Sequence, residues 1–195
     1  MIQDFWASIW KGDQALFELI NGRWTSPFLD SFLPWMRTSE HWIPLYVVLL
    51  GYLFYKWGWN AWKWLVAVAI TISITDQISS FIFKPLIHRL RPCADPAMLH
   101  QVKLLIAACP TSFSFTSSHA ANHFGLAMFI FMTLQPLLKK YTYLFFVWAG
   151  LISFAQIYVG VHYPLDVITG TVIGIFFGYT GAKLYTRWQP ISFKN

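Results

Sequence analysis

Residues 165–185 form the stretch LDVITGTVIGIFFGYTGAKLY, an apolar run of the length that a helix needs to cross a bilayer. It carries a glycine at every fourth position, Gly170, Gly174 and Gly178, which allows another helix to approach closely. We expect this face to pack on a helix of the same chain, with a homodimer through the Gly170/Gly174/Gly178 face as the alternative. The stretch therefore predicts a membrane-spanning helix.

Four further apolar runs precede it, at residues 42–57, 62–83, 120–138 and 141–161. Only 11% of the 195 residues are charged, against about 25% in soluble domains. Aromatic residues make up 19%, which suits a protein that lines two membrane interfaces. We predict one all-α membrane domain over residues 1–195, with about five transmembrane helices within residues 42–186.

Residues 1–41 are expected to form interfacial helices before this bundle. Apolar side chains recur there at helical spacing, but charges interrupt them too often for a membrane span. Ser26 and Pro27 are typical of a helix start, with serine as the N-cap and proline at the first helical position. We expect that helix to continue to about Met36.

The net charge of +6 does not indicate a nucleic-acid partner, because the cations are scattered at the ends of apolar runs. Both sides of the five-span layout carry seven cations. If Lys84, Arg89 and Arg91 are reserved for function, the positive-inside rule places the loop at residues 84–119 outside.

Cys93 and Cys109 lie in this loop, where an oxidising compartment would let them form a disulfide. Two free thiols are the alternative.

Three groups of polar residues follow in this part of the chain. Lys84, Arg89 and Arg91 place three cations within eight residues, which suits a phosphate or anionic lipid headgroups. His119 lies in the first turn of a predicted helix, whose free N–H groups favour an anion. His162 precedes another helix start, and Asp166 is within reach of one imidazole nitrogen. The other nitrogen would then be the better nucleophile.

These groups end on one side of the predicted bundle and together indicate a phosphoryl-transfer site. His119 and His123 could form a metal pair, but no acidic residue nearby in sequence completes a ligand set. No carboxylate cluster suits Mg²⁺ either. We therefore expect a histidine nucleophile, with no metal and no other cofactor.

The arrangement resembles the type 2 phosphatidic acid phosphatase superfamily, which also includes vanadium haloperoxidases. The family pattern has three elements: Lys-x6-Arg-Pro, Pro-Ser-Gly-His and Ser-Arg-x5-His-x3-Asp. The residues that match it here are Lys84, Arg91, Pro92, Ser117, His119, His162 and Asp166. The layout is similar to that of small undecaprenyl-pyrophosphate phosphatases.

By this resemblance, Lys84, Arg91, Ser117 and the backbone near Ser118 would bind phosphate. His162 would attack phosphorus and form a phosphohistidine. Asp166 would orient His162, and His119 would protonate the leaving oxygen and then activate water.

The main departure from the pattern is Gln156, which stands where the family has a phosphate-binding arginine. Glutamine keeps hydrogen bonding but loses a charge, so phosphate affinity should fall unless another cation compensates. Arg89, two residues from Arg91, is the expected candidate. Ala155, Thr116 and Ser118 also differ from the pattern.

The resemblance implies a metal-independent lipid-phosphate phosphatase in a bacterial inner membrane, with its site facing the periplasm. Its substrate would be undecaprenyl pyrophosphate, phosphatidic acid, phosphatidylglycerol phosphate or a phosphate of lipid A type. A lipid phosphotransferase that uses the same histidine is one alternative. A non-catalytic lipid-phosphate binder, suggested by Gln156, is the other.

Overall fold

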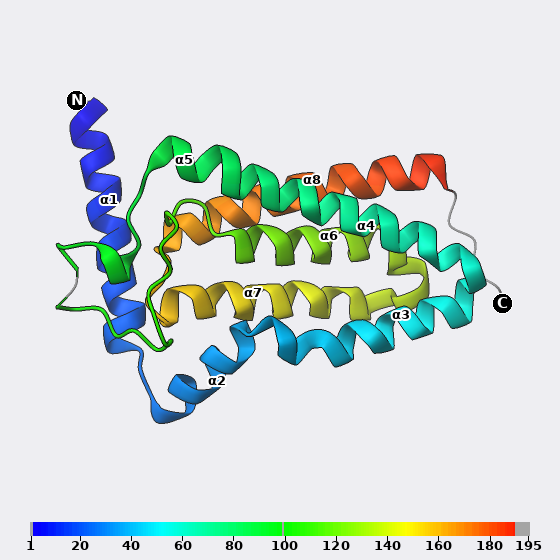
Figure 1. Cartoon of the computed structure of the whole chain (residues 1–195), viewed down its shortest axis with the longest axis horizontal. Coiled ribbons are helices and arrows are strands. Elements are labelled where there is room, and N and C mark those ends of the chain that lie inside the picture. Colours follow the sequence, from blue (N-terminus) through cyan, green and yellow to red (C-terminus); the bar gives the residue numbers. More distant parts are fainter. Residues whose placement is uncertain (1, 99, 190–195) are drawn as a thin grey trace.

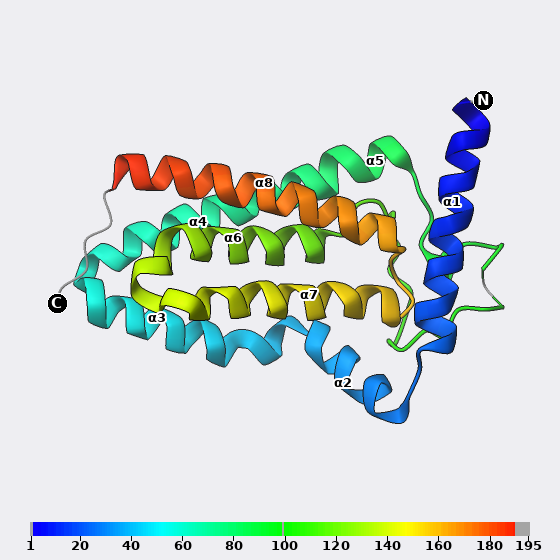
Figure 2. The ribbon, with the colours of Figure 1, turned by 180° about the vertical axis from the view of Figure 1, so that it is seen from behind.

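The computed structural model describes residues 2–98 and 100–189, which fold into helices and connecting loops and contain no strand. Its long helices run side by side (Figures 1 and 2). They are α3 (Ile43–Trp57), α4 (Ala61–Gln77), α6 (Ser118–Leu138), α7 (Tyr143–Tyr158) and α8 (Pro164–Trp188). The prediction of an all-α membrane bundle is confirmed.

Three largely helical stretches are long and apolar enough to cross a membrane, namely Ser39–Ala94, Ser118–Tyr158 and Pro164–Trp188. The first doubles back at the 3₁₀ turn Gly58–Asn60, where Gly58 has a φ of 57° that favours glycine. The second doubles back at the 3₁₀ turn Lys139–Thr142. The chain is thus a multi-pass membrane protein, while five separate crossings remain a prediction.

Helix α8 packs most closely on α6, through its glycines. A Cβ atom added at Gly170 would lie 3.2 Å from the Cβ of Ala120, and one at Gly174 would lie 2.9 Å from the backbone nitrogen of Gly125. At both positions, small residues of the two helices thus face each other. The glycine repeat is used within the chain, as the first of its two interpretations expects.

Two N-terminal helices lie outside the bundle. Helix α1 (Ile2–Glu18) crosses one end of it, and a π-helical segment, Leu19–Arg23, leads away from α1 (Figure 1). Helix α2 (Pro27–Arg37) begins where the sequence predicts, because the Ser26 hydroxyl accepts a hydrogen bond from the Leu29 N–H at 3.2 Å. Both helices sit at the end of the bundle where α8 begins.

The loop that connects the two halves of the bundle lies at the same end. The short helix α5 (Lys84–Ile87) continues the π-helical segment Ile78–Phe83 at the end of α4, and the loop then runs to Ser117 (Figure 1). A disulfide joins Cys93 and Cys109, as the first of the two cysteine alternatives predicts. Asn21 ties the loop to the bundle, since its Nδ2 donates to the backbone oxygens of Lys103 and Tyr158 at 2.8 and 2.7 Å.

Candidate active site

The imidazole of His162 is held in the short turn between α7 and α8. Gly160, with a φ of 90°, lies two residues after the end of α7, and Pro164 starts α8 two residues after the histidine. His162 is 2% exposed. Its Nε2 atom lies 3.0 Å from Nη1 of Arg91, and its Nδ1 atom lies 3.5 Å from Oδ2 of Asp166. The structure thus brings the predicted nucleophile, orienting acid and first-element arginine together.

The protonation of His162 follows from these contacts. A guanidinium can only donate, so Nε2 must be the accepting nitrogen and the proton of the neutral ring lies on Nδ1. Burial lowers the pKa of His162 to about 4, the cations Arg91 and Lys84 act in the same direction, and Asp166 opposes them. The ring is therefore neutral near pH 7, with the lone pair of Nε2 directed at Arg91.

Asp166 is fully buried in the first turn of α8 and is held by four groups. Its carboxylate accepts from the Ser114 hydroxyl, from the Tyr163 N–H at 2.8 Å and from Nη1 of Arg89 at 2.7 Å, and it faces His162. The backbone oxygen of Asp166 also accepts from the Ser117 N–H at 3.0 Å. These bonds fix α8 against the start of α6 and keep the carboxylate in place beside the imidazole.

Lys84 and Arg91 are the two cations of the first family motif, Lys-x6-Arg-Pro. Nζ of Lys84 donates to the Ser118 hydroxyl at 3.0 Å, at the first turn of α6. Arg91 is anchored by the loop, since it donates to the Ser112 oxygen at 2.7 Å and the Val161 oxygen at 3.0 Å. Both cations lie within electrostatic range of each other and of His162. The expected phosphate-binding pair is therefore assembled around the imidazole.

The first turn of α6 supplies the remaining residues of the second element. Ser117 is the N-cap, and its hydroxyl accepts from the Ala120 N–H at 3.4 Å. His119 follows in the same turn, within electrostatic range of His162 and Arg91. Nδ1 of His123 donates to the His119 backbone oxygen at 2.8 Å, and the His123 ring contacts Trp148, with ring centroids 4.8 Å apart. His123 thus braces the turn that carries His119.

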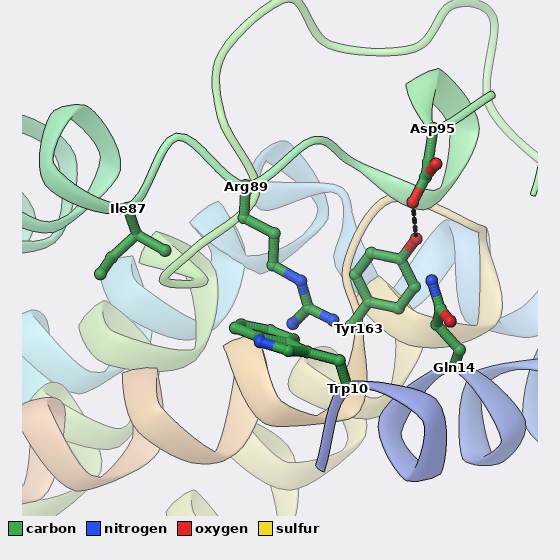
Figure 3. Close-up of a pocket in the computed structure, with 6 residues that line it drawn as sticks. All are labelled: Trp10, Gln14, Ile87, Arg89, Asp95 and Tyr163. Atoms are coloured by element: carbon green, nitrogen blue, oxygen red, sulfur yellow. Dashed lines mark hydrogen bonds between the residues drawn. The ribbon is translucent and has the colours of Figure 1, made fainter. Parts of the chain in front are cut away.

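Arg89 occupies a different position from the one that the resemblance suggests. Its guanidinium donates to Oδ1 of Asp166 at 2.7 Å and to Oδ2 of Asp13 at 2.6 Å. It is also sandwiched between the rings of Trp10 and Tyr163, 4.1 and 3.9 Å from their centroids (Figure 3). Arg89 therefore supports the carboxylate that faces His162. Its charge is already matched by two acids, which leaves it poorly placed to compensate for Gln156.

Asp13, a residue of α1, lies in the site although the sequence did not predict it there. Besides its pair with Arg89, it accepts from the Leu165 N–H at 2.8 Å, at the N-terminus of α8. Burial raises the pKa of Asp13, although Arg89 opposes the shift. Its partners lie far along the chain, 76 residues away for Arg89. One of several charged residues in the N-terminal segment was the only sequence signal.

Gln156 lies fully buried in α7, and its neighbour is a second unexpected residue, Arg37 of α2. Nε of Arg37 donates to Oε1 of Gln156 at 3.4 Å, across 119 residues of sequence. Arg37 also lies within electrostatic range of His119 and Arg91. A cation thus lies beside the position where the family pattern has its arginine, but it comes from a different helix.

Several known proteins are similar to this chain in sequence or in fold. The model of the PAP2 superfamily matches residues 60–190. A lipid A 4'-phosphatase of Bacteroides thetaiotaomicron is 35% identical over 91% of this chain and 80% of its own length. The crystal structure of Aquifex aeolicus LpxE has a TM-score of 0.61 and 28% identity, covering 87% of this chain and 94% of that one.

A second solved structure, the PAP2-type phosphatidylglycerolphosphate phosphatase from Bacillus subtilis, is similar in fold. It has a TM-score of 0.66 at 21% identity and covers 95% of this chain and 90% of its own. The family model spans all three elements of the site, from Lys84 to Asp166. The chain therefore belongs to the PAP2 superfamily of membrane lipid phosphatases.

Proposed function

We propose that this enzyme hydrolyses a lipid phosphate through a phosphohistidine on His162. The observation that supports the proposal most strongly is the placement of its imidazole. Nε2 accepts from Arg91 at 3.0 Å, while Nδ1 faces a buried carboxylate. A neutral nucleophile with a stabilised partner for its developing positive charge is what an attack on phosphorus requires.

The reaction would run in two steps. Nε2 of His162 forms a bond to phosphorus while the bond to the lipid oxygen breaks, and His119 gives that oxygen a proton. His119 then takes a proton from water, whose oxygen bonds to phosphorus as the N–P bond breaks, so that phosphate leaves and His162 is free again. Lys84, Arg91 and the N–H groups at the start of α6 would hold the phosphate oxygens.

A phosphate on lipid A is our first choice of substrate, because the Bacteroides relative carries that activity in its name and covers nearly the whole chain. An apolar groove between α3 and α7 offers room for an acyl chain. Its volume is about 540 Å³, and Met36, Trp42 and Trp148 are among the residues that line it. Trp148 also contacts His123, so one wall of the groove touches α6 one turn beyond His119.

We also propose that the site faces the periplasm of a bacterial inner membrane. The disulfide between Cys93 and Cys109 lies in the loop that carries Arg91, and such bridges persist in oxidising compartments. The count of cations outside the site supports the same orientation.

The test is release of inorganic phosphate in detergent, with a chelator present, from a panel of lipid mono- and diphosphates. Wild type is compared with His162→Ala and with His100→Ala, an exposed histidine outside the site. We expect release that only His162→Ala abolishes, with a lipid A phosphate as the best substrate. Transfer of the phosphate to another acceptor in place of free phosphate would instead identify a phosphotransferase. No turnover of any lipid by wild type would contradict the proposal.

A further inference from the structure

Arg37 is the last residue of α2, and several contacts fix the backbone on which it stands. The carbonyl groups at this end of α2 accept from side chains that follow in the chain. Trp42 Nε1 donates to the Met36 oxygen at 2.8 Å, and the Thr38 hydroxyl donates to the Pro34 oxygen at 3.0 Å. Met36 itself is buried against Trp148 of α7 in one apolar cluster. The position of Arg37 relative to α7 is therefore set by packing.

The charge of Arg37 has no acidic counterpart within residues 2–98 and 100–189. Its one hydrogen bond described there runs to a neutral amide, Oε1 of Gln156, at 3.4 Å. Its charge interacts electrostatically with two ionisable groups, His119 and Arg91, and neither is an anion. Burial lowers the pKa of Arg37, which marks the cost of holding this charge away from water. A half-buried cation near another cation is stabilised most when an anion binds between the two.

The other basic side chains near this end of the bundle show the contrast. Arg89 is matched by Asp13 and Asp166, and Lys103 by Asp30 at 2.6 Å. Lys84 and Arg91 instead make hydrogen bonds to neutral groups around His162. Arg37 belongs with this second group, whose members form no ion pair within the described part of the chain.

We propose that Arg37 is a phosphate ligand of the active site, delivered by the interfacial helix α2 and oriented by Gln156. The neutral amide of Gln156 orients the guanidinium without neutralising its charge. A glutamate at position 156 would neutralise that charge. An anion held between Arg37 and Arg91 lies next to His119, which donates the proton to the leaving oxygen. The guanidinium can supply two parallel N–H donors to phosphate oxygens. This inference rests on the proposed function for the identity of the anion.

The test measures binding of inorganic phosphate to the intact protein in detergent by calorimetry, together with the kinetics of lipid hydrolysis. Arg37→Ala is compared with wild type and with Arg23→Ala, an exposed arginine just before α2. Loss of a charge-assisted bond should weaken phosphate binding roughly ten- to hundredfold. Arg37→Lys should fall between wild type and Arg37→Ala, and Arg23→Ala should match wild type.

A rescue variant separates a ligand role from a structural one. Adding Gln156→Arg to Arg37→Ala returns a cation to the same place, so it should recover phosphate binding and turnover. A simple packing role for Arg37 would not predict this recovery. Unchanged phosphate binding in Arg37→Ala, with an active wild type, would overturn the inference and leave the proposed function intact. The wild type could also show no turnover while its phosphate binding still depends on Arg37. That result would support the inference and contradict the proposed function.

Discussion

The guanidinium of Arg91 donates from Nη1 to Nε2 of His162 across 3.0 Å. This bond fixes the neutral tautomer, with the proton on Nδ1 next to Asp166 and Ser114. It also means that the nucleophilic nitrogen already faces the cation that would bind the phosphate. When phosphate binds, Arg91 would exchange this bond for one to a phosphate oxygen and so free the lone pair of Nε2 for attack.

The first prediction concerns the titration of His162. Because burial and nearby cations lower its pKa to about 4, the ring should stay neutral down to mildly acidic pH. Heteronuclear NMR of the imidazole nitrogens, assigned with His162→Ala, should show the Nδ1–H tautomer and a midpoint near 4. A midpoint near the ordinary value of about 6.5 would contradict the account.

The same shift predicts how folding stability depends on pH. The unfolded chain binds a proton at His162 from about pH 6.5 downward, whereas the folded chain resists it until about pH 4. The stabilising contribution is complete above pH 6.5 and is lost as the pH falls from there towards 4. Thermal unfolding in detergent should therefore show a steeper acid loss in wild type than in His162→Ala.

A further prediction separates Arg89 from the cations that we propose bind phosphate. Arg89→Ala leaves two buried carboxylates without their cation, so it should cost on the order of 3 kcal/mol of stability. Its affinity for inorganic phosphate should nevertheless stay near that of wild type, whereas Arg91→Ala should lose affinity. Lys103→Ala is the control, since its pair with Asp30 is much more accessible to solvent than the Arg89 pairs and should contribute little to stability. Equal loss of phosphate affinity in Arg89→Ala and Arg91→Ala would show that Arg89 binds phosphate after all.

The disulfide gives a third prediction. Cys93 and Cys109 are 16 residues apart and close the loop next to Arg91. Removing the bridge should cost on the order of 3 kcal/mol by the loop-entropy model, and it should lower activity by loosening Arg91. The melting temperature and the rate of phosphate release should fall by similar amounts in Cys93→Ser, Cys109→Ser and the double variant. Stability of the double variant equal to that of wild type would rule out this role.

Helix packing gives a fourth prediction. A Cβ atom at Gly174 would press on the backbone of α6 near Ala121 and Gly125, so Gly174→Ala should cost roughly 1–3 kcal/mol. The displaced α6 would also move His119 relative to Asp166 and lower turnover. Gly150→Ala is the matched control, because nothing lies within 4 Å of its added Cβ. Equal melting temperatures for the two variants would contradict close packing of α6 on α8.

The sequence predicted the parts of this molecule that depend on local pattern. The apolar runs marked the helices of the bundle, and Ser26 and Pro27 marked the start of α2. The spacing from His162 to Asp166 placed the carboxylate within reach of one imidazole nitrogen, and the two groups lie 3.5 Å apart. Such features follow from periodicity and capping, which involve residues close together in the chain.

The missed features depend on packing between distant segments. Nothing near Arg37 in the sequence indicates Gln156, and nothing near Asp13 indicates Arg89. Both contacts arise because α1 and α2 fold over one end of the bundle (Figure 1). The same packing explains why Arg89, although next to Arg91 in sequence, lies between Asp13 and Asp166.

The central claim is covalent catalysis by His162, and trapping the intermediate tests it most directly. Wild type is mixed with a lipid phosphate that carries radiolabelled phosphorus, quenched in alkali, and digested for mass spectrometry. We predict label on the peptide that contains His162, stable in alkali, labile in acid and absent from His162→Ala. Phosphate release at the wild-type rate by His162→Ala, or turnover with label on another residue, would contradict the account.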